Sequence, residues 1–195
     1  MNSSLKWAVF LDRDGVINQE VNHLSHPDQL SIIPGAINAI RSLNQQSIPV
    51  IVITNQAGVA RGYFTEDDIS KVHLALQNIL KQENAFIDKF YYCPHHPEFG
   101  NEIYKISCQC RKPESGMLRQ ASQDLGLILE RSYLIGDKSS DIQAGYNVGC
   151  KTALVMTGHG MKEITNYSNS FASPHFVAPS IVEAVRWILE QECSG

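Results

Sequence analysis

Two carboxylates, Asp12 and Asp14, directly follow the apolar run at residues 7–11, and a glycine comes next. Short apolar runs are typical of strands buried in a parallel sheet, and ligands bind beyond the carboxyl ends of such strands. Alternate residues of an extended chain point the same way, so both carboxylates can face one point. They would repel each other there unless a cation lay between them, and Mg²⁺ is the usual hard cation for oxygen ligands. On its own, the pair is equally compatible with a simple turn.

Three further segments place polar groups near the ends of predicted strands. At residues 54–56, a hydroxyl and successive backbone N–H groups can cradle phosphate oxygens. Arg111 and Lys112 supply cations that the net charge of −4 does not. Asp137 and Asp141 lie one helical turn apart after another apolar run. Each segment has an ordinary alternative, namely a turn, a solvated surface pair and an N-capping aspartate. Together with the first pair they predict one shared site.

A second cluster is formed by cysteine and histidine. Cys93 and His95 are followed after twelve residues by Cys108 and Cys110. Three thiolates and one imidazole make a closed tetrahedral Zn²⁺ site with no open position for water, which is a structural site. In a reducing compartment such a cluster favours metal over disulfides. Spacing alone leaves His96 as an alternative ligand, and free cysteines beside a His-Pro loop as an alternative to metal.

The position of the predicted zinc site suggests its use. Cys110 directly precedes Arg111 and Lys112, so a metal bound at Cys110 would fix where these cations point. The loop at residues 94–109 has little apolar content with which to order itself. We therefore hypothesise that zinc positions the substrate-binding cations.

The rest of the chain alternates between strand and helix patterns. Such alternation predicts an α/β fold, with a doubly wound parallel sheet and helices on both faces. The gaps between the motifs are too short for a cap domain, and no linker divides the chain, so we expect one domain over residues 1–195. The predicted strands cover residues 7–11, 49–54, 89–93, 132–135 and 151–155, and the helices residues 35–45, 116–125, 139–147, one beginning near 65 and one from 180 to about 192.

Composition narrows the range of partners. The chain has 195 residues, 43% of them hydrophobic, as in ordinary globular proteins. A net charge of −4 gives no reason to expect nucleic acid or an anionic membrane surface. No apolar stretch approaches the ~20 residues that span a bilayer, and the N-terminus does not resemble a signal peptide. We expect a cytoplasmic protein, and a monomer because no exposed apolar helix stands out.

The four motifs as a group resemble those of the haloacid dehalogenase (HAD) superfamily of phosphohydrolases, over about residues 9–158. This resemblance implies an aspartyl-phosphate mechanism. Asp12 would be the nucleophile, and Asp14 would act as general acid and then base. Thr54 and Lys112 would hold the phosphoryl oxygens. Catalytic Mg²⁺ would be bound by Asp12, Asp137 and the backbone carbonyl of Asp14, while Asp141 orients its neighbours.

Finer details resemble one family within that superfamily, the heptose bisphosphate phosphatases. The resemblance implies a small-molecule sugar bisphosphate that loses its 7-phosphate on the way to nucleotide-activated heptose, commonly for lipopolysaccharide. The segments that carry it are residues 12–15, 54–62, 93–97, 108–113 and 136–138. The substrate contacts that it implies are Arg13, Glu20, Val21, Asn22, His23, Asn55, Gln56, Ala57, Arg111 and Lys138.

Other functions compete with this interpretation. Histidinol-phosphate phosphatases resemble the chain in the four motifs and zinc ligands, but typically have a shorter zinc loop and lack the segment at residues 60–62. A catalytically silent module that binds phosphorylated ligands is disfavoured because all the reacting groups are present. A nucleic-acid 3′-phosphatase would need a basic surface that this composition does not provide.

Overall fold

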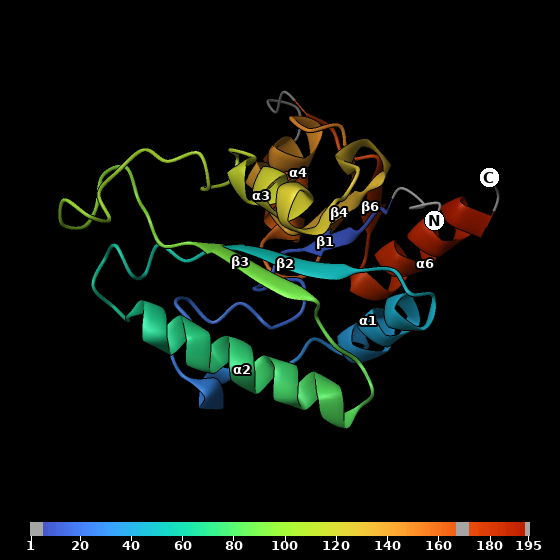
Figure 1. Cartoon of the computed structure of the whole chain (residues 1–195), viewed down its shortest axis with the longest axis horizontal. Coiled ribbons are helices and arrows are strands. Elements are labelled where there is room, and N and C mark those ends of the chain that lie inside the picture. Colours follow the sequence, from blue (N-terminus) through green and yellow to red (C-terminus); the bar gives the residue numbers. More distant parts are fainter. Residues whose placement is uncertain (1–5, 167–171, 194–195) are drawn as a thin grey trace.

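The predicted parallel sheet is confirmed by a computed structural model that describes residues 6–166 and 172–193 (Figure 1). Its strands run in the order β3-β2-β1-β4-β5-β6, and every neighbouring pair is parallel. The strand order reverses between β1 and β4. Open α/β sheets bind ligands at such a point, beyond the carboxyl ends of the strands. The strands are β1 (Val9–Leu11), β2 (Val50–Asn55), β3 (Lys89–Cys93), β4 (Tyr133–Gly136), β5 (Lys151–Val155) and β6 (Phe176–Ala178).

Helices cover both faces of this sheet (Figure 1). One face packs against α1 (Ala36–Gln45), α2 (Glu66–Gln82) and α6 (Ile181–Cys193), and the other against α3 (Gly116–Leu125) and α4 (Ser139–Tyr146). The remaining helical elements are η1 (Pro27–Gln29), η2 (Leu129–Arg131) and α5 (Gly160–Asn166). Within the described ranges, no helix is long and apolar enough to cross a membrane.

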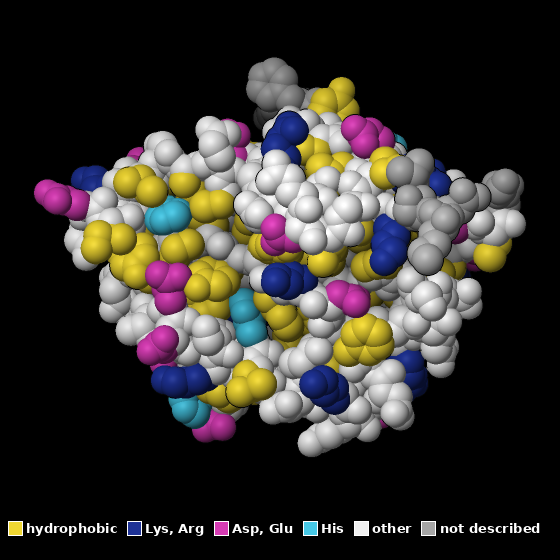
Figure 2. All heavy atoms as spheres, viewed as in Figure 1, with side chains coloured by type: hydrophobic (Ala, Val, Ile, Leu, Met, Phe, Trp, Pro, Cys, Tyr) yellow, Lys and Arg dark blue, Asp and Glu magenta, His cyan; other side chains and the backbone are white. Residues whose placement is uncertain are grey.

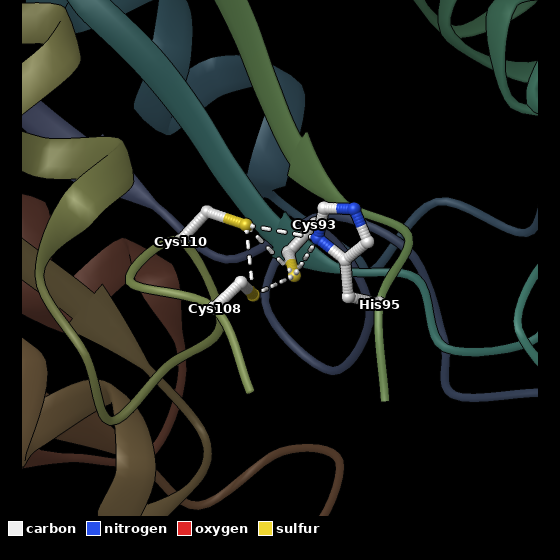
Figure 3. Close-up of side chains that lie close together, drawn as sticks. All are labelled: Cys93, His95, Cys108 and Cys110. Carbon is white, nitrogen blue, oxygen red and sulfur yellow. Dashed lines mark hydrogen bonds between the residues drawn. The ribbon is translucent and has the colours of Figure 1, made fainter. Parts of the chain in front are cut away.

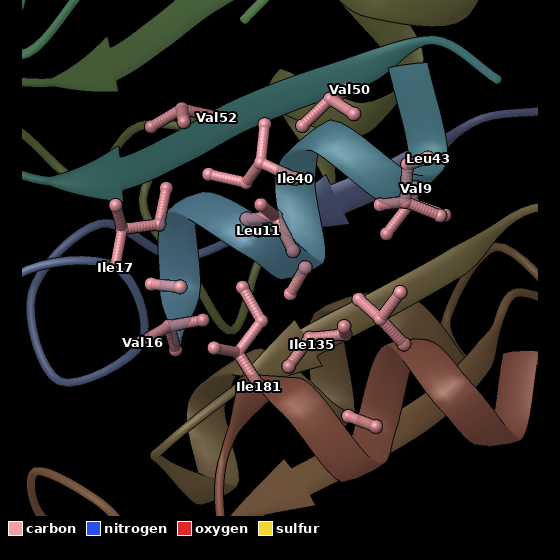
Figure 4. Packing of buried hydrophobic residues seen from close by; sticks show 14 of the residues in the cluster. Val9, Leu11, Val16, Ile17, Ile40, Leu43, Val50, Val52, Ile135 and Ile181 are labelled. Carbon is pink, nitrogen blue, oxygen red and sulfur yellow. The ribbon is translucent and has the colours of Figure 1, made fainter. Parts of the chain in front are cut away.

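Strand β1 shows how the sequence produces two layers. Val9 and Leu11 point to one side and Phe10 to the other, because successive side chains of a strand alternate. Val9 and Leu11 join the core that α1 and α6 cover, where Ile40 is fully buried (Figure 4). Phe10 joins the core under α3 and α4. Since both faces are buried, β1 has no polar residue until the chain leaves the sheet at Asp12.

Helix α2 begins where the sequence predicts. The Thr65 hydroxyl accepts a hydrogen bond from the Asp68 backbone N–H, and the Asp68 carboxylate accepts one from the Thr65 backbone N–H. This capping box satisfies two N–H groups that the first turn leaves without helical partners. The apolar residues at helical spacing then face the sheet, and Leu76 is fully buried.

Strand β6, helix α5 and the short 3-10 helices η1 and η2 were not predicted. Strand β6 has only three residues and lies at the edge of the sheet, with Val177 exposed, so it lacks a buried apolar run. Its place is fixed by Phe176, whose ring stacks on Trp187 of α6 with 5.0 Å between the ring centroids. Helix α5 is short and largely polar. The sequence assigned no role to residues 171–179, of which Phe171 lies outside the described residues.

Two of the three leucines of α2, Leu74 and Leu76, offer a matched test of this packing. Leu76 is fully buried, whereas Leu74 on the same helix is 64% exposed. We predict that Leu76→Ala lowers the free energy of unfolding by about 2 to 5 kcal/mol. Leu74→Ala has the same effect on helix propensity but should change it by no more than about 0.5 kcal/mol. Denaturant unfolding of both variants measures the difference, and equal losses would contradict this packing.

Candidate active site

The ends of three adjacent strands bring the predicted catalytic residues together. Asp12 and Asp14 follow β1, Thr54 lies in β2, and Asp137 follows β4. Lys112 reaches the same place from the loop before α3. A cavity of about 520 Å³ lies beside them, and all of them except Asp137 line it. The predicted site residues that line it are Asp12, Asp14, Glu20, Asn22, His23, Thr54, Asn55, Gln56, Ala57, Arg111, Lys112 and Lys138.

Three buried carboxylates meet at the bottom of this site. One oxygen from each of Asp12, Asp137 and Asp141 lies within 4.8 Å of the others. Burial and the charge of Asp141 raise the pKa of Asp12 to about 6, against the opposing charge of Lys112. Burial and the charges of Asp12 and Asp141 raise the pKa of Asp137 to about 8. The carboxylates thus lie where a cation would relieve both burial and repulsion.

One atom of Asp137 is left free for such a cation. Its Oδ1 is buried and has no hydrogen-bond partner among the described residues. Its Oδ2 accepts a hydrogen bond of 2.8 Å from the backbone N–H of His159. Buried polar atoms are rarely left unpaired, and carboxylate oxygens are the donors that Mg²⁺ prefers. The residues therefore fit a divalent cation at this position.

Two glycines make room for Asp137. Gly15 and Gly158 have positive φ angles of 85° and 59°. A Cβ atom at either position would come within 2.2 or 2.3 Å of Asp137 Oδ2. Backbone from the loops after β1 and β5 thus approaches the carboxylate more closely than any other residue type would permit.

Lys112 is the cation that balances the carboxylates. Its ammonium lies 3.0 Å from Asp12 Oδ1 and 2.5 Å from Asp141 Oδ1. It also donates a 2.9 Å hydrogen bond to the carbonyl of Ile53. Burial alone would lower the pKa of Lys112, but the two carboxylates raise it above its ordinary value, so the side chain stays charged. Asp141 thus contacts Lys112 and holds it beside Asp12.

The backbone of Lys112 is held by Asn55. The Asn55 side chain donates to the Lys112 carbonyl and accepts from the Lys112 N–H, both at 3.0 Å. This reciprocal pair fastens the loop before α3 to the end of β2. The sequence suggested a substrate contact for Asn55, whereas in the structure its side-chain amide positions Lys112.

Asp14 has a different environment from Asp12. Arg13 donates to both of its carboxylate oxygens, at 3.0 Å from Nε and 2.7 Å from Nη2. Gln56 adds a third donor at 3.2 Å and also donates to the hydroxyl of Thr54. Burial would raise the pKa of Asp14, but the charge and hydrogen bonds of Arg13 outweigh it and lower that pKa. The pKa values of Asp12 and Asp14 are therefore displaced in opposite directions, upward for Asp12 and downward for Asp14.

Two predicted substrate contacts do not face the cavity. The Arg13 side chain is fully buried and bound to Asp14, so only its backbone remains for a ligand. Val21 is exposed but does not line the cavity. Glu20 does line it, and its carboxylate lies 3.5 Å from the ammonium of Lys138. His23 packs edge-on against Tyr63 at its rim.

Three basic or imidazole side chains in the cavity wall were not among the predicted substrate contacts. Arg61, His96 and His159 line it but were not predicted to bind substrate. Arg61 could have been found from the sequence, because it is a basic residue in the loop that follows the strand with Thr54. His159 is found through its backbone contact with Asp137, which the sequence does not indicate.

The four predicted zinc ligands lie together (Figure 3). The sulfurs of Cys93, Cys108 and Cys110 are 3.0–3.4 Å apart, and His95 Nδ1 lies 3.4 Å from Cys110 Sγ. His96 points elsewhere, because its Nδ1 accepts a hydrogen bond from a backbone N–H two residues on. Three sulfurs and one imidazole nitrogen fit a closed Zn²⁺ site.

The zinc-site loop, residues 94–109, has few other means of ordering itself. Hydrophobic side chains gather on its surface (Figure 2), and Phe99, Ile103 and Ile106 are exposed. Its tip is held by Tyr104, which donates a hydrogen bond to Glu66 of α2. At its base, Arg111 Nη1 donates to the backbone carbonyl of His95 at 3.3 Å. A metal bound by His95 and Cys110 would therefore fix both partners of that contact.

The fold and the groups at its strand ends define a phosphoric monoester hydrolase of the HAD-like class. A family model described as HAD-hydrolase-like matches residues 109–184. The D-glycero-beta-D-manno-heptose-1,7-bisphosphate 7-phosphatase of Haemophilus influenzae is 39% identical over 92% of this chain and 95% of its own. The Escherichia coli K12 protein of the same name is 38% identical over 95% of each chain.

A solved structure agrees with these relatives. A D,D-heptose 1,7-bisphosphate phosphatase from B. bronchiseptica, complexed with magnesium and phosphate, has a TM-score of 0.85 to this structure. It is 31% identical and covers 95% of this chain and 99% of its own. Within the HAD-like class, the chain belongs to the family of heptose bisphosphate phosphatases.

Removing a zinc ligand tests whether the loop positions the cations. We predict that Cys110→Ser lowers the zinc content measured by elemental analysis and raises KM for a phosphate ester, because Arg111 and Lys112 lose their fixed position. Cys193→Ser is the matched control, since Cys193 is exposed and remote from the cluster. A zinc-free Cys110→Ser protein with an unchanged KM would contradict the hypothesis.

Proposed function

We propose that this enzyme hydrolyses the 7-phosphate of D-glycero-D-manno-heptose 1,7-bisphosphate. The relatives' names support the sugar, and the distribution of positive charge in the cavity supports two phosphates. Near the carboxylates, Lys112 and Lys138 each have an acidic partner. Arg61 and Arg111 line the same cavity and have no ion pair within the described part of the chain.

The unpaired arginines carry the proposal. The guanidinium of Arg61 lies 3.8 Å from the centre of the Phe99 ring, and among the described residues Arg111 donates a hydrogen bond only to a backbone carbonyl. Both charges are close enough to His96 to lower its pKa, after the effect of burial. Two guanidiniums in one wall suit a second phosphate, which accepts their N–H groups in pairs. Histidinol phosphate has an ammonium group in place of a second anion, so this wall disfavours it.

In the first step, a carboxylate oxygen of Asp12 attacks phosphorus. The new O–P bond forms as the bond from phosphorus to the sugar oxygen breaks, and Asp14 gives a proton to that leaving oxygen. Asp14 must take up this proton before the step, because Arg13 lowers its pKa in the free site. Thr54 and Lys112 bind the phosphoryl oxygens while charge moves across the group. The product of this step is an aspartyl-phosphate on Asp12 and a heptose monophosphate.

In the second step, water replaces Asp12 on phosphorus. The Asp14 carboxylate takes a proton from water as the water oxygen bonds to phosphorus and the bond to Asp12 breaks. Inorganic phosphate leaves, and Asp14 is protonated again for the next cycle. Mg²⁺, bound by Asp12, Asp137 and the backbone carbonyl of Asp14, would neutralise charge on the transferring group.

The proposal extends to the enzyme's setting. We infer a cytoplasmic, monomeric enzyme that acts as one domain and supplies nucleotide-activated heptose for lipopolysaccharide. The net charge of −4 and the absence of an apolar stretch of bilayer length support this setting.

Side-by-side assays test the reaction and its nucleophile. With Mg²⁺, both anomers of the heptose bisphosphate and histidinol phosphate should be compared, and we expect higher kcat/KM for a heptose bisphosphate. Asp12→Asn should lower the rate at least ~10³-fold if Asp12 is the nucleophile. Asp124→Asn serves as the control, because Asp124 is an exposed residue of α3. Faster turnover of histidinol phosphate would overturn the substrate, and near-normal turnover by Asp12→Asn would overturn the mechanism.

Arg61 tests the second phosphate directly. Arg61→Gln removes a charged donor, so KM for the bisphosphate should rise about 10-fold or more. KM for 4-nitrophenyl phosphate, which has one phosphate, should stay within about twofold, since it lacks the group that Arg61 would bind. Arg41→Gln is the control, because Arg41 contacts Asn38 and Glu83 and does not line the cavity. Equal changes in KM for both substrates would exclude a selective role.

A further inference from the structure

A buried histidine lies behind the active site without a role in the proposed reaction. His73 of α2 is 8% exposed and occupies the apolar face of that helix, beside Val72 and Leu76. Its ring stacks on Phe90 with 4.5 Å between ring centroids and 19° between planes. Its Nε2 atom lies 3.3 Å from Nη1 of Arg13. A polar ring in such a place is stable only when its nitrogens find partners.

Arg13 occupies the space between this histidine and the reacting groups. Its side chain has no exposed surface, although a guanidinium is costly to bury unless it is paired and hydrogen-bonded. Nε and Nη2 donate to the Asp14 carboxylate, and Nη1 faces His73 on the other side. The orientation of the guanidinium is therefore fixed from two directions.

For His73 to serve as this partner, its ring must be neutral. Burial, and then the charge of Arg13, lower the pKa of His73 to about 3. A neutral ring with its proton on Nδ1 presents an acceptor at Nε2, whereas an imidazolium would place two positive charges together. The distance and the burial thus agree with a hydrogen bond from Arg13 to His73.

The same contacts distinguish the two oxygens of Asp14. Oδ2 accepts from Arg13 at 2.7 Å and from Gln56 at 3.2 Å. Oδ1 accepts from Arg13 alone, at 3.0 Å, among the described residues. A carboxylate oxygen has two lone pairs, so Oδ1 keeps one for a proton that passes to or from a ligand.

We propose that His73 is a positioning residue for the reaction: through Arg13 it holds Asp14 so that Oδ1 faces the substrate for proton exchange. This inference rests on the acid and base role proposed above for Asp14, and does not depend on which sugar is bound. It explains why a fully buried arginine follows the nucleophile, and why a histidine interrupts the apolar face of α2.

The role predicts an effect that depends on the leaving group. An alkoxide leaves phosphorus readily only if it receives a proton, whereas 4-nitrophenolate is stable without one. A change that misplaces the Asp14 carboxyl group should therefore lower kcat/KM for an alkyl phosphate more than for an aryl phosphate. A change that merely loosens the fold should lower both alike.

The experiment compares glycerol 1-phosphate with 4-nitrophenyl phosphate, using the metal-loaded enzyme. We expect His73→Phe, which keeps a ring for Phe90 but loses the acceptor, to lower the alkyl-to-aryl ratio of kcat/KM at least ~10-fold, part of the 10²–10⁴ that a general acid contributes. His73→Gln retains an acceptor and should restore the ratio to within ~3-fold of the unmodified enzyme. Val72→Ala is the matched control, because it removes buried atoms from the same helix face without contacting Arg13, and should leave the ratio unchanged.

Asp14→Asn separates the two possible failures. If that variant shows no dependence on the leaving group, the proposed role of Asp14 fails, and this inference fails with it. If Asp14→Asn shows the dependence but His73→Phe lowers both substrates equally or neither, Asp14 keeps its role and the positioning role of His73 is wrong. Should His73→Phe not fold, an unchanged ratio in His73→Leu would overturn the inference equally.

Discussion

The buried ammonium group of Lys112 is the interaction on which the site depends. One oxygen from each of Asp12, Asp137 and Asp141 lies within 4.8 Å of the others, and all three residues are buried, which three unpaired anions would not tolerate. Lys112 contacts two of them, and Asp137 keeps an oxygen without any partner in the described residues. The chain's own charges therefore balance only part of the site, and what is left over suits a divalent cation.

Lys112 does not belong to the sheet, so contacts outside the strand ladder must fix its position. The Asn55 amide fastens its backbone to the end of β2, and the last ligand of the cysteine cluster, Cys110, lies two residues before it. The residues that hold Lys112 in place are thus different from the acids that it contacts. The ends of β1 and β4 and the first turn of α4 supply the acids, and the segment between the cysteine cluster and α3 supplies the cation that lets those acids lie together.

Much of this arrangement could be predicted because it depends on local patterns. Apolar runs that end in Asp12 and Asp137 indicated both the parallel sheet and the edge that carries the site. The spacing of Cys93, His95, Cys108 and Cys110 indicated which side chains would meet. The helix at residues 116–125 and the strands at 89–93 and 151–155 have the predicted bounds, because each is bordered by a clear change of pattern.

What could not be predicted depends on contacts between distant segments. The family resemblance implied a substrate contact for Arg13, and only the approach of α2 shows that its side chain lies beside His73. From the sequence alone, His73 is one more residue of a predicted helix, with no indication of its contact with Arg13. Strand β6 was missed because three residues, of which only Ala178 is buried, carry too little pattern. Its place beside β5 depends on the contact between Phe176 and a helix that follows it.

The zinc-site loop is attached at two places, and this affects how the active site can be shielded from solvent. Glu66 accepts hydrogen bonds from Tyr104 in the loop and from Tyr92 in β3, while the cysteine cluster ties the loop's base. A wall fixed at both ends does not have to fold down over a ligand, as mobile covers in other enzymes do. Dehydration must then come from the site itself, where Asp12 and Lys112 are each only 4% exposed before any ligand arrives. The active site is therefore ordered when the protein folds, and substrate binding has little further ordering to induce.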